Sequence, residues 1–291
     1  MNRSTYSGAA SPIVCRGDSR IGGFLLEAGK LRPEDIERIL RLQMDLGVRF
    51  GEAARRLGLV SDAEIEQVLA LQFDYPYLPL GPGRYSPYLL AAHAPFSDPV
   101  EALRAVRSQL MLRWFDRGRK SLVLLGINGG DGASLFAANL AVVFAQLGEH
   151  TLLVDANLRQ PGQNQIFDLK GRTGLSDLLA GRAELDVIDR VDALAGLHVL
   201  QAGTVPPNPH ELLSRTSFGD LHARLETRFD VVLYDVAPYM LGSDALAIAA
   251  RSGGVLLLAR RNRTLLSELD AAGAQMTGGG VEVVGSVMLE F

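Results

Sequence analysis

The chain has 291 residues, of which 47% are hydrophobic and 21% are charged, a composition typical of a globular protein with room for about two domains. The net charge of −4 argues against bulk nucleic-acid binding, and the single cysteine, Cys15, rules out a disulfide framework or a thiolate metal cluster. No segment is long and apolar enough to span a membrane, so these features together predict a cytoplasmic protein.

Residues 1–19 contain no extended apolar stretch and are expected to be a flexible tail rather than a signal peptide. A tandem repeat follows, in which residues 20–43 and 49–72 form two copies of 24 residues with a spacer of five. The paired positions are Arg20/Arg49, Gly22/Gly51, Gly29/Gly58, Ile36/Ile65, Glu37/Glu66, Leu40/Leu69, Leu42/Leu71 and Gln43/Gln72. A period of this size indicates a duplicated supersecondary unit, and two equivalent half-sites suit a two-fold symmetric ligand.

Each copy is predicted to form two short helices joined at its second glycine. Gly29 and Gly58 follow helical stretches and can adopt the left-handed conformation that ends a helix. Pro33 suits the first turn of the next helix, and Ser61 with Glu64 forms a capping box. The alternative is that the repeated positions are only the core of a small helical domain or a docking surface for a partner.

This repeat resembles the N-terminal domain of type II secretion and type IV pilus assembly ATPases, most closely the MshE-type version, which binds cyclic di-GMP through two 24-residue motifs. The resemblance covers residues 20–78. It implies a cyclic di-GMP site formed by Arg20, Ile21, Gly22, Gly29, Gln43, Arg49, Phe50, Gly51, Gly58 and Gln72. Arginine can pair with phosphate or with the O6/N7 edge of guanine, and glutamine can bond a base edge. Ile21 and Phe50 stand where the pattern has leucine, and Ala54 stands where the first copy has Leu25.

Residues 79–97 are expected to be a linker rich in proline, glycine and tyrosine, and residues 98–291 a second domain. In this second domain apolar runs alternate with helical patterns. The strand candidates are 121–127, 150–156, 197–203, 229–236, 253–259 and 281–289. Continuous apolar runs separated by helices predict an α/β fold, a parallel sheet with helices on both faces, which the glycine loop described next makes similar to P-loop NTPases.

Four glycines separate the first strand of this domain from the helix that follows: Gly126, Gly129, Gly130 and Gly132. A loop at this position cradles phosphate with its backbone N–H groups and a helix N-terminus. The standard motif ends in Gly-Lys-Ser/Thr, whereas this loop reads Gly130, Asp131, Gly132, Ala133, Ser134. The lysine is therefore missing, although Ser134 can still reach a Mg²⁺.

Residues 98–291 resemble the bacterial tyrosine kinases of polysaccharide export, P-loop proteins of the ParA/MinD branch. The matching segments are LLVDANLRQP with Asp155, Asn157 and Arg159, VVLYDVAP with Asp235, and residues 203–213. The resemblance implies ring assembly through Glu101, Arg104 and Arg107, which form an E-x-x-R-x-x-R pattern. A repeat domain followed by a kinase-like domain is similar to the EpsG-type chain-length determinant kinases, which act beside a Wzz-type membrane co-polymerase.

Ala133 and Asn157 depart from this kinase pattern. Phosphoryl transfer depends on positioned charge, and the loss of one stabilising group commonly costs ~10²–10³ in rate. Asn157 replaces a family aspartate, and Asn128 stands where the MinD branch has its signature lysine. Ser134, Asp155 and Asp235 remain as candidate Mg²⁺ ligands of a weak Mg-ATP or Mg-ADP site.

The sequence favours a cyclic di-GMP-responsive regulator of exopolysaccharide synthesis or chain length over an enzyme. Its degenerate kinase-like domain would form a homo-oligomer and dock a membrane co-polymerase, so the protein would be peripheral at the inner membrane through that partner. The alternatives are a weak or active tyrosine autokinase and a ParA/MinD-like positioning ATPase.

Overall fold

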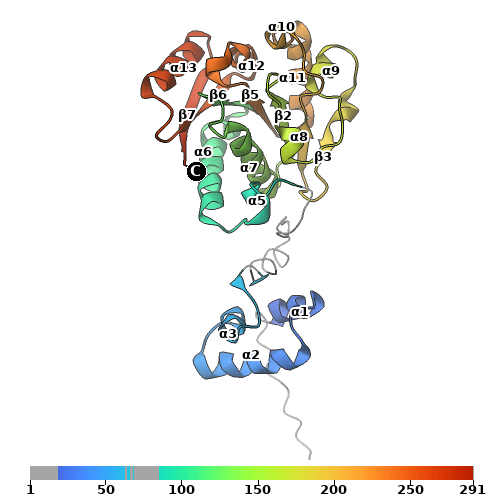
Figure 1. The fold of residues 1–291 in the computed structure, drawn as a ribbon, viewed down its shortest axis with the longest axis vertical. Helices are drawn as coiled ribbons and strands as arrows, with labels where there is room; N and C mark the ends of the chain where they lie inside the picture. Colours follow the sequence, from blue (N-terminus) through green and yellow to red (C-terminus); the bar gives the residue numbers. More distant parts are fainter. Residues whose placement is uncertain (1–18, 63, 66–67, 69–84, 291) are drawn as a thin grey trace, which may run out of the picture. The chain divides into compact units, whose positions relative to one another are not determined.

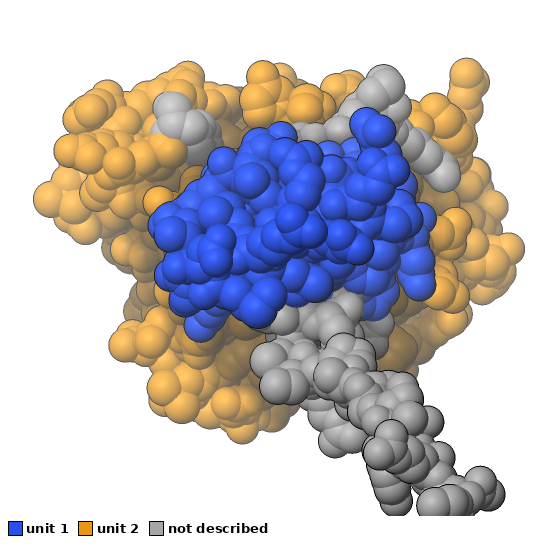
Figure 2. Space-filling model, turned by 90° about the horizontal axis from the view of Figure 1, so that it is seen from below, with its two compact units in different colours: residues 1–75 blue, residues 76–291 orange. Residues whose placement is uncertain are grey.

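The computed structural model describes residues 19–62, 64–65, 68 and 85–290 (Figure 1). The chain divides into two compact units, residues 1–75 and 76–291, which Figure 2 colours blue and orange. Within the described residues no helix combines the length and the apolar character needed to cross a membrane.

Unit 1 is built from the two sequence repeats, and both copies end their first helix in the same way. Its helices are α1 (Ser19–Glu27), α2 (Pro33–Leu46) and α3 (Phe50–Arg56), and residues 62, 64, 65 and 68 are helical again. Gly29 and Gly58 have φ of +68° and +66°. In each copy the glycine N–H bonds a carbonyl three residues back, and the next N–H bonds one five residues back, which is the Schellman pattern. The predicted left-handed helix ends are therefore confirmed.

The predicted capping box is also present. Ser61 N–H donates to Glu64 Oε2 at 2.9 Å, and Glu64 N–H donates back to Ser61 Oγ at 3.3 Å. The hydrogen bond from the Ser61 amide, together with Lys30, lowers the pKa of Glu64 to about 2. Lys30 Nζ lies 2.9 Å from Glu64 Oε1, so the end of the first helix of the first repeat is tied to the second repeat.

The core of unit 1 uses equivalent positions of the two repeats. The buried pairs, 29 positions apart in sequence, are Leu25/Ala54, Leu31/Val60 and Ile39/Val68. Phe50 and Ala53 complete the cluster. The repeat is thus a structural duplication.

Unit 2 is an α/β unit around a seven-stranded sheet. Its strands are β1 (Ser121–Gly126), β2 (Thr151–Ala156), β3 (Asp189–Arg190), β4 (Leu197–Leu200), β5 (Val231–Val236), β6 (Gly254–Arg260) and β7 (Glu282–Leu289). The order is β3-β4-β2-β5-β1-β6-β7, and every pairing is parallel except β3 with β4. The expected parallel sheet is confirmed. The two-residue edge strand β3 was not predicted, because it is too short to carry a periodic signal.

Helices cover both faces of the sheet (Figure 1). They are α5 (Leu90–His93), α6 (Asp98–Arg113), α7 (Ala133–Gln146), α8 (Gln163–Ile166), α9 (Leu175–Leu179), α10 (Pro209–Ser214), α11 (Thr216–Arg228), α12 (Asp244–Ser252) and α13 (Leu266–Gly278); short 3-10 turns are η1 (Phe115–Arg117), η2 (Leu185–Val187) and η3 (Tyr239–Leu241). Alternate residues of β1 face opposite cores: Leu122 and Leu124 join the cluster with α5–α7, and Val123 and Leu125 join the cluster with α9–α12. Both faces are therefore buried, which explains why the strands read as continuous apolar runs.

The second half of the expected linker is packed against unit 2. Leu89, Ala91 and Ala92 are fully buried. Ala91 N–H donates to Asn139 Oδ1 at 2.8 Å, and Gln146 Nε2 donates to the Ala91 carbonyl at 2.8 Å. Because the apolar run 89–92 covers α7, residues 85–97 belong to this unit, whereas residues 79–84 lie outside the described part.

Gly254 offers a direct test of this packing. A Cβ there would overlap the ring of Trp114, which is buried and donates a 2.9 Å hydrogen bond to the Ser121 carbonyl. We expect Gly254→Ala to destabilise unit 2 by about 1–3 kcal/mol, because the ring has no free space to move into. Gly278→Ala is the matched control, since a Cβ there meets nothing within 4 Å. Chemical denaturation measures both, and equal midpoints would contradict the packing.

Candidate functional site

Two aspartates lie side by side at the carboxyl ends of neighbouring strands. Asp155 on β2 and Asp235 on β5 are register partners in the parallel pairing, and both are fully buried. Asp155 accepts hydrogen bonds from three backbone amides: Oδ1 from Asn157 N–H at 3.3 Å, and Oδ2 from Gly162 and Gln163 N–H at 3.0 Å each. This places both predicted acidic residues in one site.

Burial makes both carboxyl groups reluctant to ionise. Burial, reinforced by repulsion from Asp235, raises the pKa of Asp155 to about 7. Burial likewise raises the pKa of Asp235 to about 6, against the opposing effect of a hydrogen bond from Gln163. Near neutral pH the two carboxyl groups therefore retain a proton to a greater extent than two surface carboxylates would.

Gln163, which the sequence analysis did not select, connects this pair to the glycine loop. Its Nε2 donates to Asp235 Oδ2 at 2.7 Å and to the Ser134 carbonyl at 2.9 Å. Asp235 Oδ1 and Gln163 Oε1 are buried and have no hydrogen-bond partner among the described residues. An unpartnered carboxylate oxygen close to Ser134 fits a Mg²⁺, an oxygen-binding cation that retains several waters. The described residues contain no cluster of three or more His, Cys, Asp or Glu side chains, so such an ion would depend on water and a ligand.

The glycine loop has the shape of an anion cradle. Gly130 and Gly132 have φ of +77° and +84°, a conformation that favours glycine, and α7 begins directly after them. No described residue accepts a hydrogen bond from the backbone N–H of Gly129, Gly130 or Gly132. Such open amides ahead of a helix N-terminus suit a phosphate group.

Two arginines, one at the end of β6 and one in the turn that follows, bond the carbonyl side of this loop. Arg263 Nη2 donates to the Gly129 carbonyl at 3.2 Å and Arg263 Nη1 to the Gly130 carbonyl at 3.2 Å. Arg260, the last residue of β6, donates from Nη1 to the Gly130 carbonyl at 3.0 Å. Both arginines are far from the loop in sequence and belong to no motif, so sequence reasoning had no signal for them.

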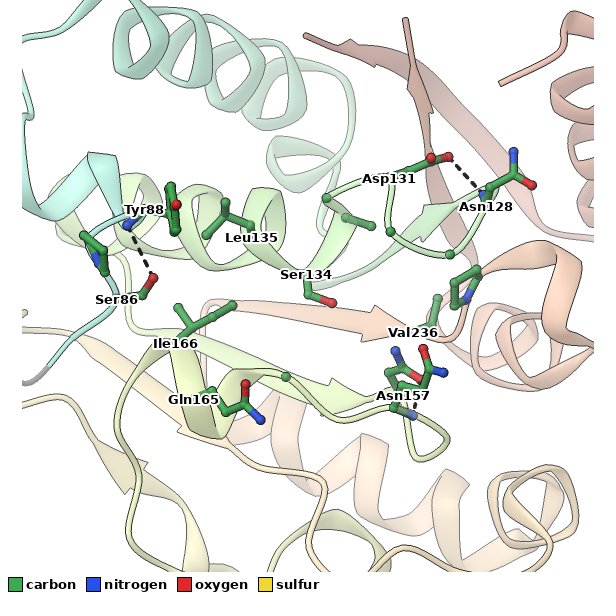
Figure 3. Close-up of a pocket in the computed structure, with 18 residues that line it drawn as sticks. Ser86, Tyr88, Asn128, Asp131, Ser134, Leu135, Asn157, Gln165, Ile166 and Val236 are labelled. Atoms are coloured by element: carbon green, nitrogen blue, oxygen red, sulfur yellow. Dashed lines mark hydrogen bonds between the residues drawn. The ribbon is translucent and has the colours of Figure 1, made fainter. Parts of the chain in front are cut away.

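The loop borders a cleft of about 610 Å³ at the carboxyl edge of the sheet (Figure 3). It is lined by Ser86, Pro87, Tyr88, Asn128–Leu135, Asn157, Gln160, Gly162, Gln165, Ile166, Val236 and Pro238. Figure 3 shows Tyr88 beside Leu135 at one end, Asn128 and Val236 at the other, and Ser134 between them. Among the described residues of this lining Asp131 is the one that is charged, and none is a lysine or an arginine. The described part of the cleft therefore keeps the form of a phosphate site without a side-chain cation in its wall.

Two residues of the second acidic motif have roles outside phosphate binding. Arg159 makes a bidentate ion pair with buried Asp244, with Nε–Oδ2 at 2.6 Å and Nη2–Oδ1 at 3.0 Å, and does not line the cleft. Asn157 does line it, but its Oδ1 accepts the Gln160 N–H at 3.1 Å. The segment between β2 and α8 is thus fixed by its own side chains.

The residues predicted to mediate assembly make contacts within the chain. Arg104 Nη1 donates to Glu101 Oε2 at 2.8 Å, and Arg104 also bonds the Pro95 carbonyl. Arg107 Nη1 donates to the Val143 carbonyl of α7 at 2.8 Å. Glu101 remains largely exposed. Assembly through this helix stays a prediction.

In unit 1 most of the predicted ligand residues also have a packing role. A Cβ on Gly22 would lie 3.1 Å from Phe50 Cζ and 3.5 Å from Ile36 Cδ1, and one on Gly51 would lie 3.4 Å from Ile65 Cγ2. Phe50 is buried, so base stacking on its ring would require the ring to leave the core.

Arg49 differs from these residues: it is exposed and makes no ion pair with any described residue. Ile21 is half-buried, and Gln43 is half-buried on α2. The Arg20 side chain and Gln72 lie outside the described part.

A phosphate loop between a strand and a helix, with paired aspartates at adjacent strand ends, defines a P-loop NTPase-like unit. MinD from Pyrococcus horikoshii, solved with Mg-ADP, has this fold, with a TM-score of 0.51 over 58% of this chain and 69% of that one, at 21% identity. No profile of a protein family matches the chain.

Individual relatives identify the family. CapB of Staphylococcus aureus, which carries the name of a tyrosine-protein kinase, is 31% identical over 194 residues, covering 67% of this chain and 85% of CapB. The chain belongs to the bacterial tyrosine-protein kinase family. The tyrosine-protein kinase wzc of Salmonella typhimurium is 32% identical over 200 residues, 69% of this chain, and the match spans 28% of that protein. The kinase domain of Escherichia coli ETK superposes with a TM-score of 0.68 at 29% identity, over 74% of this chain and 88% of that one.

The paired aspartates predict a pH dependence. Because the folded state raises both pKa values, their contribution to stability is greatest in acid and is lost as the pH rises through about 6 to 7. We expect Asp235→Asn to gain stability relative to the wild type between pH 5 and pH 8, by up to roughly 3 kcal/mol for a shift of about two pKa units. Denaturation across this range measures it, with the exposed Asp220→Asn as control. A difference between Asp235→Asn and the wild type that does not change with pH would contradict the buried-pair assignment.

Proposed function

We propose that this chain is a regulatory member of the bacterial tyrosine kinase family that controls exopolysaccharide synthesis or chain length in response to cyclic di-GMP. In this proposal residues 20–78 are the sensor and residues 98–291 are a degenerate kinase unit. That unit docks a Wzz-type membrane co-polymerase and assembles as a homo-oligomer, and the protein stays cytoplasmic, peripheral at the inner membrane through its partner.

The observation that carries this proposal is that no described residue places a side-chain cation in the wall of the cleft. Ala133 occupies the lysine position, and the lining contributes Asp131 as its single charge. Phosphoryl transfer needs positive charge at the transferring group, and backbone amides alone supply partial charges. A cleft of this kind is better suited to binding a nucleotide than to catalysing phosphoryl transfer from it.

Several residues would hold Mg²⁺ with a bound nucleotide. The Ser134 hydroxyl and the free Oδ1 of Asp235 are the available oxygens, with Asp155 behind them. When bound, Mg²⁺ would neutralise phosphate charge. Asp235 must lose its proton to bind the ion, so affinity for Mg²⁺ should increase as the pH rises through about 6.

Arg49 supports the sensor assignment. The fold itself uses Gly29 and Gly58 as helix ends, and it packs Gly22 and Gly51 against isoleucines. The exposed guanidinium of Arg49 has no comparable packing or helix-ending role among the described residues. An unpaired arginine at the start of a repeat suits a phosphate or guanine edge of cyclic di-GMP.

A weak tyrosine autokinase is the second candidate. The open amides of the loop and the aspartate pair favour it, because both are parts of a nucleotide site. The relatives that share these segments are named tyrosine-protein kinases.

Calorimetry of the full chain tests the sensor. We expect cyclic di-GMP to bind, and Arg49→Ala to weaken binding about ten- to hundred-fold, the effect of losing a charged hydrogen bond worth ~1.5–3 kcal/mol. Arg41→Ala is the control, because Arg41 is exposed and pairs with Glu37 on the surface of α2. If the Arg20→Ala/Arg49→Ala double variant bound as tightly as the wild type, the site would lie elsewhere.

Radiolabelled ATP tests the catalytic unit. We expect the wild type to show no tyrosine autophosphorylation and negligible hydrolysis, because none of the described residues that line the cleft is a lysine or an arginine. Ala133→Lys should raise nucleotide affinity at least tenfold, whereas Ala133→Met, which has length without charge, should not. Ala133→Lys with Asn157→Asp is the fuller repair. Wild-type phosphotyrosine that disappears in Asp155→Ala would favour the autokinase instead.

A further inference from the structure

Arg263 lies where it can act on one open amide of the glycine loop. The peptide that joins Gly129 to Gly130 presents its carbonyl to Arg263 Nη2 at 3.2 Å, and its N–H belongs to Gly130, which has no acceptor among the described residues. The next carbonyl, that of Gly130, accepts from both arginines, at 3.0 Å from Arg260 and 3.2 Å from Arg263. A charged donor on a carbonyl polarises the peptide and makes its N–H a stronger donor.

The turn that carries the arginines is itself fixed to the loop. Thr264 Oγ1 donates to Asp131 Oδ2 at 3.1 Å and accepts the Arg260 N–H at 2.9 Å. Asp131 Oδ2 also accepts the Asn128 N–H at 3.1 Å. The guanidinium groups are therefore held on the loop by the same contacts that shape it.

The buried charge at the loop is an ion pair. The guanidinium of Arg263 faces the buried carboxylate of Asp131, whose Oδ1 lies 3.5 Å from Arg263 Nε. Glu268 accepts the Asn128 Nδ2 hydrogen bond at 3.0 Å but lies at the surface, where water and salt screen its charge. The Asp131 carboxylate therefore helps to hold the Arg263 guanidinium on the carbonyl side of the loop.

Unpartnered atoms below the loop also indicate a ligand. Asp235 Oδ1 and Gln163 Oε1 are buried without partners in the described structure, and Gln163 donates to the Ser134 carbonyl. Oxygens of this kind suit Mg²⁺ or its coordinated water, which accompanies a polyphosphate.

We propose that Arg263, assisted by Arg260, replaces the missing lysine by acting through the loop peptides, so that the cleft still binds the pyrophosphate group of a nucleoside di- or triphosphate. Arg263 is a positioning residue here, since its guanidinium lies on the carbonyl side of the loop. The inference rests on the proposed function only in taking the cleft as a site that binds a nucleotide without catalysing phosphoryl transfer.

Titration of the full chain with Mg-ADP and with Mg-pyrophosphate tests this inference. Arg263→Ala should weaken binding of both at least tenfold. Arg261→Ala is the matched control from the same turn, because Arg261 is exposed and pairs with Glu290 at 2.7 Å, away from the loop. Ala133→Lys in the Arg263→Ala background should restore at least wild-type affinity, because it returns the charge directly.

The outcomes distinguish an electrostatic role of Arg263 from a purely structural role in supporting the loop. Failure of Ala133→Lys to rescue Arg263→Ala, with unfolding midpoints unchanged, would mean that Arg263 only supports the loop and would overturn the inference. Wild-type protein that binds neither probe, or Arg263→Ala that binds like the wild type, would overturn it as well. Titration of the same samples with cyclic di-GMP reports on the sensor independently, so failure of one proposal is distinguishable from failure of the other.

Discussion

The in-register pairing of β2 with β5 is the constraint on which the site depends, because it fixes Asp155 next to Asp235 inside the core. Two neighbouring carboxyl groups are costly to bury charged, so the segment after β2 folds back to donate three amides to Asp155. Gln163, at the end of that segment, bonds both Asp235 and the Ser134 carbonyl. The aspartate pair and the phosphate loop are therefore connected by the hydrogen bonds of one side chain.

The phosphate loop separates two functions that a lysine usually combines, holding phosphate and stabilising the charge that develops during transfer. Its left-handed glycines and open amides have the geometry that the first function requires. Positive charge remains nearby, but Arg260 and Arg263 lie on the carbonyl side of the loop, and their effect reaches the cleft through peptide dipoles. Such charge is fixed and partial, which suits binding better than catalysis.

The N-terminal repeat shows how one residue pattern can have two explanations. Gly29 and Gly58 are fully explained as helix ends, and Gly22, Gly51 and Phe50 by close packing. A fold of this kind would keep these residues without any ligand. Arg49 is what the packing does not explain, since an exposed arginine that makes no ion pair with a described residue adds little to stability. The ligand hypothesis for the repeat therefore depends on its arginines more than on its glycines.

The sequence by itself determined the elements whose signal is local. Apolar runs marked six of the seven strands, because the central strands of the sheet are buried on both faces, and repeated glycines marked the helix ends, because those positions need a left-handed backbone. The loop and both aspartates were also evident, since each follows a strand. Only the tertiary structure revealed the side chains that complete the site. Gln163 meets Asp235 across 72 positions, and Arg263 meets Gly129 across 134. Residues 85–97 resembled a linker because no local sequence pattern indicates that they pack against α7. Contacts of this kind arise from the order of the strands and the packing of helices upon them, which no short stretch of sequence encodes.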